Sequence, residues 1–350
     1  MWESAVIDWF RANQRPLPWR THPSAYATLV SEFMAQQTQL TTVIPYFERW
    51  MHRFPSLADV ANAHEDAIFK QWEGLGYYSR AKNLQRAATI IVRDFNGVIP
   101  QSAQQLQTLP GIGPYIAAAI ASIAFGEAVA VVDGNVLRVI ARFFGLYDDI
   151  ADQKTKQSIQ IRLNRHIAHV HPGDFNQGLM ELGALVCTKN PVCDTCCLRP
   201  QCYAANMDQI QSLPVKKKAP PVPRHTVVVG LIRRSSDQKI LITKRKKDQL
   251  LGGLWEFPGG KVRDNESHHD ALIRELYEEL NMTVCVDDFI CTAKHAYSHF
   301  KITLHAYYCS VSNTDSFLLK SADDYRWIAP EDVAQFAFPK ANRLIFSHIT

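Results

Sequence analysis

Apolar residues in the first 205 positions recur at the spacing of α-helices. Segments such as SAVIDWFRAN, YATLVSEFMAQQT, VIPYFERWMHRF and RAKNLQRAATIIVRDF place apolar side chains three or four positions apart. Short polar, glycine or proline breaks separate these segments. The pattern predicts an all-helical domain over residues 1–205.

The hydrophobic period changes after a stretch rich in proline and lysine, SLPVKKKAPPVPRH. Proline favours extended backbone, so residues 206–224 are expected to form a semi-rigid basic linker. Beyond it, HTVVVGLIRR, KILITKR and FKITLHAYYCSV show the alternating or continuous apolar runs of strands, and HHDALIRELYEEL shows the period of a helix. Residues 225–350 are therefore predicted to form a smaller α/β domain.

Composition adds one asymmetry to this picture. Hydrophobic residues make up 47% and charged residues 21%, which is ordinary for a globular protein, and the net charge is only +4. However, 11 lysines and arginines lie between Lys216 and Lys247, against the single acid Asp237. Such a stretch suits a polyanion such as nucleic acid, although a solvated linker and edge strand explain it equally well.

The chain shows no sign of a membrane segment. The N-terminus MWESAVIDWF is acidic and aromatic, unlike a signal peptide. The most apolar run, residues 116–132, is interrupted by Gly126 and Glu127, which makes it too short to span a bilayer. We therefore expect a cytoplasmic protein without membrane contact.

The stretch LQTLPGIGPYIAAAIASIAFG predicts two helices joined by a tight turn. Gly111 and Gly113 can both adopt positive φ there, and Pro114 suits the first position of the second helix. The exposed amides of such a hairpin, at a helix N-terminus, form a phosphate site with no side chain in the way. A plain helix–turn–helix connection is the alternative.

Two acids occupy unusual positions. Asp133 precedes the helix that begins at Gly134, where an N-cap is the simplest role. Glu32 lies on an apolar helical segment beside Val30 and Phe33. A buried carboxylate is costly unless it is paired or functional, and burial should raise its pKa as a general acid requires.

Five of the eight cysteines cluster within sixteen positions. The spacing Cys187-x5-Cys193-x2-Cys196-x5-Cys202 gives four thiolates suited to a [4Fe-4S] cluster or to zinc. In a reducing compartment such a group indicates metal rather than disulfides. The spacing alone does not distinguish the two metals.

In combination these motifs resemble the MutY adenine DNA glycosylases of the endonuclease III, or helix-hairpin-helix, superfamily. The resemblance covers residues 5–205 and includes SEFMAQQTQLTTVIPYFERW, GLGYYSRAKNL and VVDGNVLRVIAR. It implies that Glu32 protonates the adenine, that Asp133 stabilises the sugar cation, and that the cluster is [4Fe-4S]. It further implies that Gln37 wedges into the duplex, that Tyr77 lies beside the damaged pair, and that the residues bordering the extruded adenine are Trp19, Arg20 and Glu181.

One position argues against strand cleavage. Tyr115 stands where strand-cutting members of the superfamily carry a lysine that forms a Schiff base, which tyrosine cannot do. We therefore expect base removal without efficient strand cleavage. Two features depart from the family pattern: the gap after Cys187 has five residues instead of six, and Cys197 is additional.

The stretch GGKVRDNESHHDALIRELYEELNM carries a second motif. Its spacing, Gly260-x5-Glu266-x7-Arg274-Glu275-Leu276-x-Glu278-Glu279, resembles the Nudix box, with Asn281 in place of the late glycine. The three carboxylates Glu275, Glu278 and Glu279 share one helical face, where they repel one another unless Mg²⁺ or Mn²⁺ binds. A solvated acidic face is the alternative.

Residues 225–350 as a whole resemble MutT-like Nudix domains. The resemblance implies that Arg245 and Asn342 contact an oxidised base, and that HAYSHF forms a recognition loop for 8-oxoguanine. The residues of that loop expected to recognise the lesion are Tyr297, Ser298 and His299. An ordinary β-turn is the alternative for this loop.

The main interpretation is a monofunctional adenine DNA glycosylase of base excision repair. Its expected partner is duplex DNA with an A:8-oxoguanine or A:G mispair, and we expect a monomer associated with the nucleoid. An alternative is that the Nudix domain also, or mainly, hydrolyses 8-oxo-dGTP to the monophosphate with Mg²⁺ or Mn²⁺. A bifunctional glycosylase/lyase and a mismatch-binding module without catalysis fit the residues less well.

Overall fold

A computed structural model of the chain describes every residue except 218–220, 298–299, 312–316 and 350. The chain forms two compact units. The first consists of Met1–Asn62 with Asn83–Ala219, and the second of Ala63–Lys82 with Pro220–Thr350. The helical segment Ala63–Lys82 thus groups with the C-terminal unit, although the sequence pattern had assigned it to a helical domain over residues 1–205.

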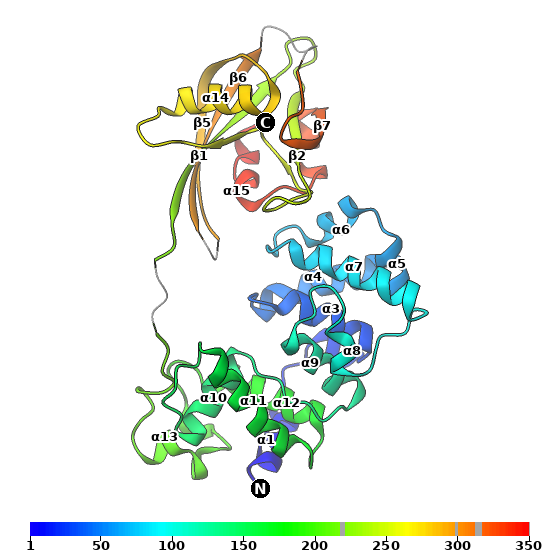
Figure 1. Ribbon diagram of the computed structural model, residues 1–350, viewed down its shortest axis with the longest axis vertical. Coiled ribbons are helices and arrows are strands. Elements are labelled where there is room, and N and C mark those ends of the chain that lie inside the picture. Colours follow the sequence, from blue (N-terminus) through cyan, green and yellow to red (C-terminus); the bar gives the residue numbers. More distant parts are fainter. Residues whose placement is uncertain (218–220, 298–299, 312–316, 350) are drawn as a thin grey trace. The chain divides into compact units, whose positions relative to one another are not determined.

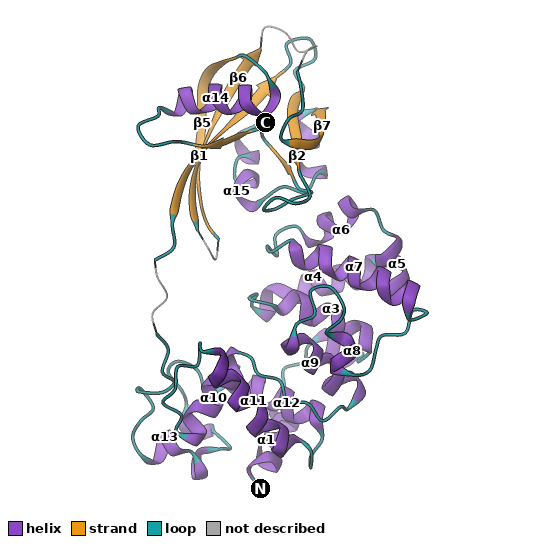
Figure 2. Cartoon of the chain, in the orientation of Figure 1, coloured by secondary structure: helices purple, strands orange, loops and turns teal. Residues whose placement is uncertain are grey.

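The first unit is built from helices, as predicted (Figures 1 and 2). Helix α7 (Ser79–Asp94) begins in the second unit and ends in the first. The other helices of the first unit are α1 (Trp2–Asn13), α2 (Pro18–Thr21), α3 (Ala25–Ala35), α4 (Leu40–Arg53), α5 (Leu57–Asn62), α8 (Ala103–Leu106), α9 (Pro114–Phe125), α10 (Gly134–Phe144), α11 (Gln153–Ile167), α12 (Pro172–Leu185) and α13 (Tyr203–Asn206).

Helix α12 packs against α1, α9 and α10. Two of its glycines allow this close approach. A Cβ atom added at Gly178 would lie 2.7 Å from a methyl carbon of Val6, and one at Gly183 would lie 2.6 Å from the Cβ of Asn135. Such contacts cannot accommodate a side chain without movement of the backbone. The interhelical packing therefore fixes the part of α12 between these glycines, which carries Glu181.

The predicted hairpin joins α8 to α9. Gly111 has a φ of +77°, and a Cβ there would lie 2.6 Å from the Cβ of Asn83. The prediction for Gly113 was wrong in one respect: its φ is −82°, which any residue can adopt. Gly113 is instead the N-cap of α9, with open space where a side chain would lie, and Pro114 is at the first helical position. Backbone amides of this helix start can thus be approached closely.

The second unit contains the predicted α/β fold. Its sheet has the order β3-β2-β1-β6-β5, β1 and β6 are parallel, and β4 and β7 pair with β1 and β2. The strands are β1 (Arg224–Arg233), β2 (Ile240–Arg245), β3 (Trp255–Glu256), β4 (Gly259–Lys261), β5 (Val284–Ala296), β6 (Lys301–Val311) and β7 (Ala322–Ile328). The helices are α6 (Glu65–Trp72), α14 (His268–Leu280) and α15 (Lys340–Arg343).

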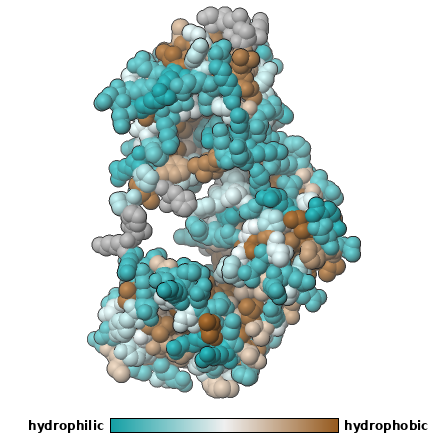
Figure 3. Space-filling view, viewed as in Figure 1, coloured by the Kyte–Doolittle hydropathy of each residue, from teal (hydrophilic) through white to brown (hydrophobic). Residues whose placement is uncertain are grey.

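The alternation of β1 produces two cores. Val228 and Ile232 face α14, where Leu272 and Leu276 are buried. Val229 and Leu231 face the opposite side, which the segment containing α15 covers. Polar side chains cover much of the visible surface, with smaller apolar patches among them (Figure 3). None of the helices in the described part of the chain combines the length and the apolar character of a membrane span.

Candidate active site

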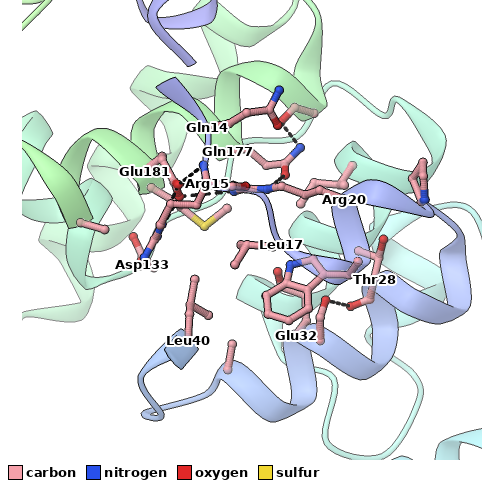
Figure 4. A pocket seen from close by; sticks show the side chains of 18 of the residues that line it. Gln14, Arg15, Leu17, Arg20, Thr28, Glu32, Leu40, Asp133, Gln177 and Glu181 are labelled. Carbon is pink, nitrogen blue, oxygen red and sulfur yellow. Dashed lines mark hydrogen bonds and ion pairs between the residues drawn. The ribbon is translucent and has the colours of Figure 1, made fainter. Parts of the chain in front are cut away.

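A cavity of about 940 Å³ opens in the helical unit (Figure 4). Its walls come from α3, α9, α10 and α12 and from the chain around α2. Of the residues singled out in the sequence, those that line it are Trp19, Arg20, Glu32, Tyr115, Asp133 and Glu181. The fold thus places both predicted catalytic acids, Glu32 and Asp133, at the wall of one cavity.

Glu32 lies on α3 between side chains that are fully buried, among them Val30 and Phe33. Its side chain borders the cavity, but the Oε2 atom is buried and has no hydrogen-bond partner among the described residues. Burial raises the pKa of Glu32 to about 7, against a hydrogen bond with Tyr115 that favours the ionised form. The predicted upward shift of this pKa is therefore present.

Asp133 is both the N-cap of a helix and a residue of the cavity wall. It is the N-cap of α10, because Oδ1 accepts a hydrogen bond of 2.7 Å from the backbone N–H of Val136. Its Oδ2 accepts a bond of 3.0 Å from the side-chain amide of Asn135. Burial raises the pKa of Asp133, and these hydrogen bonds oppose the rise. The carboxylate borders the cavity at the same time.

Asn135 is in turn held by Arg138. The guanidinium Nη2 donates to Asn135 Oδ1 at 2.9 Å and to the carbonyl of Gly183 at 2.7 Å, while Nε donates to the carbonyl of Cys187 at 2.7 Å. A chain of hydrogen bonds therefore runs from the carboxylate of Asp133 to the backbone of the cysteine loop. No local pattern in the sequence marks Asn135 or Arg138 for this role.

Glu181 is buried at 2% exposure and accepts hydrogen bonds from two arginines. Arg15 donates from its backbone N at 3.0 Å, from Nε at 2.7 Å and from Nη2 at 2.8 Å, and Arg20 donates two bonds of 3.3 Å. Although burial alone would raise it, these hydrogen bonds bring the pKa of Glu181 down to about 2. The carboxylate is therefore ionised at neutral pH.

Three lining residues have roles that the sequence did not predict. Arg15 binds Glu181, Gln177 accepts a hydrogen bond of 3.0 Å from Arg20 Nε, and the hydroxyl of Tyr115 is hydrogen-bonded to Glu32. The tyrosine had been singled out because it replaces a lysine, without any expectation that its hydroxyl would meet the acid. None of these partners is close in sequence to the residue it binds.

The remaining predicted DNA contacts lie outside the residues that line the cavity. Gln37 is exposed in the turn between α3 and α4, with a φ of +54°, and neighbouring Thr38 borders the cavity. Tyr77 belongs to the second unit, is 38% exposed and has a φ of +49°. Both side chains thus sit on backbone that residues other than glycine seldom adopt.

The four predicted ligand cysteines border a second, small cavity in the helical unit, together with Arg142. The guanidinium of buried Arg142 lies 3.5 Å from the sulfur of Cys187 and donates to the carbonyls of Thr188, Lys189 and Leu213. Cys197 is absent from this lining and packs against the adjoining hydrophobic core. The shorter loop therefore still gathers the four thiols that the spacing predicted.

Arg274, Glu275, Glu278 and Glu279 of the Nudix box lie on α14 as expected, and Asn281 ends that helix with a φ of +55°. Arg274 Nη1 contacts Glu275 at 2.8 Å and Glu278 at 3.3 Å, and its Nε contacts Glu266 at 2.6 Å. Within the described residues, no three His, Cys, Asp or Glu side chains form a group that could hold one metal ion. The Mg²⁺ or Mn²⁺ site stays a prediction.

Glu279 of the same motif has a raised pKa. Burial raises its pKa to about 7, with further contributions from Glu256 and Glu275. A Cβ at Gly260 would lie 2.2 Å from the carboxyl carbon of Glu275, so that glycine gives the carboxylate room. Glu275 and Glu279 of the box therefore lie close enough for their charges to interact.

The predicted oxidised-base contacts have partners inside the α/β unit. Arg245 pairs with Glu256, and Asn342 Oδ1 accepts a hydrogen bond of 3.1 Å from the backbone N–H of Phe257. Tyr297 stacks on Phe300 with ring centroids 4.7 Å apart. Ser298 and His299 lie outside the described residues.

Replacing Glu181 with glutamine should destabilise the helical unit, because two arginines would lose their buried counter-charge. Arg15 is one-third exposed, so we expect a loss of about 2–3 kcal/mol in the free energy of unfolding. The difference from wild type should shrink as the pH falls from near 4.5 towards 2, where Glu181 itself becomes protonated. Urea denaturation followed by circular dichroism measures both effects.

The matched control is Asp174→Asn, which weakens the more exposed ion pair with Arg11. It should cost less than about 1 kcal/mol. Equal losses in the free energy of unfolding would show that the buried ion pairs of Glu181 stabilise the unit no more than the exposed pair of Asp174 does.

Comparison with known proteins agrees with this geometry. The HhH-GPD superfamily of base excision DNA repair proteins matches residues 30–165, and the NUDIX domain matches residues 228–348. An adenine DNA glycosylase of Mus musculus is 32% identical over 98% of this chain and 76% of its own length, and one of Buchnera aphidicola subsp. Acyrthosiphon pisum is 30% identical over 84% and 82%. The structure of a thermostable thymine-DNA glycosylase matches 59% of this chain and 95% of its own, with 25% identity and a TM-score of 0.54. The chain belongs to the family of adenine DNA glycosylases.

Proposed function

We propose that this protein removes adenine that is mispaired with 8-oxoguanine or guanine in duplex DNA, by hydrolysing the N-glycosidic bond. One observation carries the proposal: Glu32, with a pKa of about 7, and Asp133 border the same cavity. The space of about 940 Å³ is within the usual range for ligand sites. A base can enter it only after leaving the stack, as in other enzymes that act on bases.

The chemistry requires the two acids to act in different protonation states. Adenine becomes a good leaving group when the Glu32 carboxylic acid transfers its proton to the ring. The bond from the sugar C1′ to the base then breaks with its electron pair on the base, and the ionised Asp133 stabilises the cation left on the sugar. Water adds to C1′ and its proton passes to the Glu32 carboxylate, which completes the hydrolysis and restores the acid.

Tyr115 supports a reaction that ends with base removal. A lyase needs an amine that attacks C1′ and forms a Schiff base. No lysine is present among the described residues that line the cavity, and the hydroxyl of Tyr115 is engaged with Glu32. Strand cleavage therefore has no nucleophile in this site.

The duplex is expected to contact exposed features around the cavity. Gln37 would enter the stack in place of the extruded base, since Thr38 beside it borders the cavity. The amides at the start of α9, near Gly111 and Gly113, would bind a phosphate. Such contacts make binding weaken with salt.

We assign recognition of 8-oxoguanine to the α/β unit, through Arg245, Asn342 and the loop that contains Tyr297. The stacked pair of Tyr297 and Phe300 and the nearby cation of Arg245 are groups that suit an aromatic base. Hydrolysis of 8-oxo-dGTP by the Nudix box remains the alternative function of this unit.

The cysteine loop is expected to hold a [4Fe-4S] cluster. Its donors are four thiols around one cavity, with no imidazole or carboxylate among the lining residues described. Four thiols are a ligand set that such clusters use, and Cys187, Cys193, Cys196 and Cys202 are the residues that would hold it. When bound, the cluster would fix the loop that Arg138 connects to Asp133.

The proposed activity is tested by base release from an A:8-oxoguanine duplex, with and without alkali. Adenine should appear in both samples, and strand breaks only after alkali. Glu32→Gln should slow release by about a hundredfold or more while duplex affinity is kept, because the proton donor is lost. Glu48→Gln, which changes an exposed acid on α4, is the control. Undiminished release by Glu32→Gln would exclude the proposed acid.

The rate of release should depend on pH in a defined direction. Glu32 loses its proton as the pH rises through about 7, so the single-turnover rate should fall above that pH. At the acidic end the rate should fall when Asp133 becomes protonated. Asn135→Ala removes a hydrogen bond that lowers the pKa of Asp133, and should therefore move the acidic limb to higher pH. A shift of the alkaline limb instead would contradict these assignments.

Iron and sulfide analysis distinguishes the cluster from zinc. The purified protein should contain about four iron atoms per chain and absorb visible light. Replacing Cys193 with serine should lower the iron content, whereas Cys197→Ser should leave it unchanged, because Cys197 lies outside the cavity lining. Zinc in place of iron would reject the proposed cluster.

A further inference from the structure

The segment Ala63–Lys82 packs against the rest of the second unit along helix α6. Near its start, Asp66 forms an ion pair of 2.7 Å with Lys244 of β2. Along the helix, the ring of Phe69 packs against Gly253. A Cβ added at Gly253 would lie 2.7 Å from a carbon of this ring, and the φ of +85° at this position also favours glycine. This segment is therefore built into the C-terminal unit by charge and by packing.

The loop that follows α6 presents Tyr77. Gly74, Gly76 and Tyr77 all have positive φ, at +103°, +74° and +49°. Positive φ in a residue with a large side chain costs free energy and persists where surrounding contacts impose it. The carbonyl of Gly76 accepts bonds from Trp72 Nε1 at 3.1 Å and from Arg80 Nη2 at 3.0 Å. The Arg80 guanidinium also lies 5.3 Å from the Tyr77 ring centroid.

Both ends of this loop bind the backbone of one residue, Phe338. Its N–H donates to Glu73 Oε1 at 3.1 Å, and its carbonyl accepts from the hydroxyl of Tyr78 at 3.4 Å. Phe338 is fully buried and packs on Phe257 in the core of the α/β unit. The two attachment points therefore move with that core.

Glu73 is built for this attachment. It is buried at 8% exposure, and its Oε2 accepts a bond of 2.6 Å from Lys70, which also donates to the carbonyl of Ala334. Arg343 of α15 lies 3.7 Å from Oε1. A buried carboxylate with these partners is costly to truncate, because the N–H of Phe338 and the nearby cations lose their acceptor.

We propose that Glu73 and Tyr78 are positioning residues, through which the α/β unit sets the place of Tyr77 at the DNA. The inference rests on the proposed function in that the duplex is the substrate. Tyr77 is exposed at 38% and held in a costly conformation, and an aromatic ring so presented can stack on a base. The C-terminal unit thus contributes to DNA binding through Tyr77 as well as through its own recognition loop.

The test is a double-mutant cycle on the full-length chain, with affinity for an A:8-oxoguanine duplex as the readout. Glu73→Ala removes the acceptor of the Phe338 N–H, whereas Glu73→Gln keeps an oxygen there and serves as the conservative variant. Each is combined with Tyr77→Ala. Glu127→Ala is the matched control, because Glu127 also accepts a backbone N–H, from Ala103 at 2.6 Å, but lies in the helical unit.

Glu73→Ala should weaken duplex binding about tenfold, Glu73→Gln should restore it to within about twofold, and Glu127→Ala should leave it unchanged. If Glu73 acts through Tyr77, then Glu73→Ala should add less than about twofold once Tyr77 is alanine. Tyr78→Phe should weaken binding in the same direction. Independent losses that multiply in the double variant would overturn the proposal, as would full affinity in Glu73→Ala.

Adenine release by the same proteins keeps the two claims separate. A wild-type chain that binds the duplex without releasing adenine would reject the proposed function, while the affinity cycle would still report on Glu73. Release with an additive cycle would reject the positioning role alone. Circular dichroism of each variant confirms that the change in affinity comes from folded protein.

Discussion

Burial of one carboxyl group, that of Glu32, governs the rest of the cavity. Desolvation penalises the charged form, and the Oε2 atom finds no partner within the described structure that would offset the penalty. The group therefore keeps its proton up to a pH of about 7. The other charged residues of the cavity must therefore be arranged so that they do not lower the pKa of Glu32 much below 7.

The positions of the two acids in their helices explain why their environments differ. Glu32 lies within α3, where the amides around it are already bonded along the helix. Asp133 lies at the start of α10, where free amides and the helix dipole favour a negative charge, and where Val136 and Asn135 donate to it. Burial raises the pKa of both acids, and the helix start adds hydrogen bonds that oppose this rise at Asp133.

The sequence predicted those parts of the fold and site that have a local pattern. The helical period, the N-cap position of Asp133 and the spacing of the cysteines are each visible within a few residues. The ion pair of Arg15 with Glu181 joins residues 166 positions apart, and the bond of Glu73 to Phe338 joins residues 265 apart. Contacts of this kind depend on tertiary packing, and no period or motif reveals them. For the same reason the grouping of Ala63–Lys82 with the α/β unit could not be foreseen.

The arginines of the cavity show how the site protects its acid. Arg20 lowers the pKa of Glu32, so an unopposed cation at this place would favour loss of the Glu32 proton. Glu181 binds Arg20 and Arg15 together and stays ionised far below neutral pH. The negative charge of Glu181 therefore offsets the two arginine charges at every pH well above 2. The two arginines are held by Glu181, and the pKa of Glu32 stays near 7 although Arg20 is close to it.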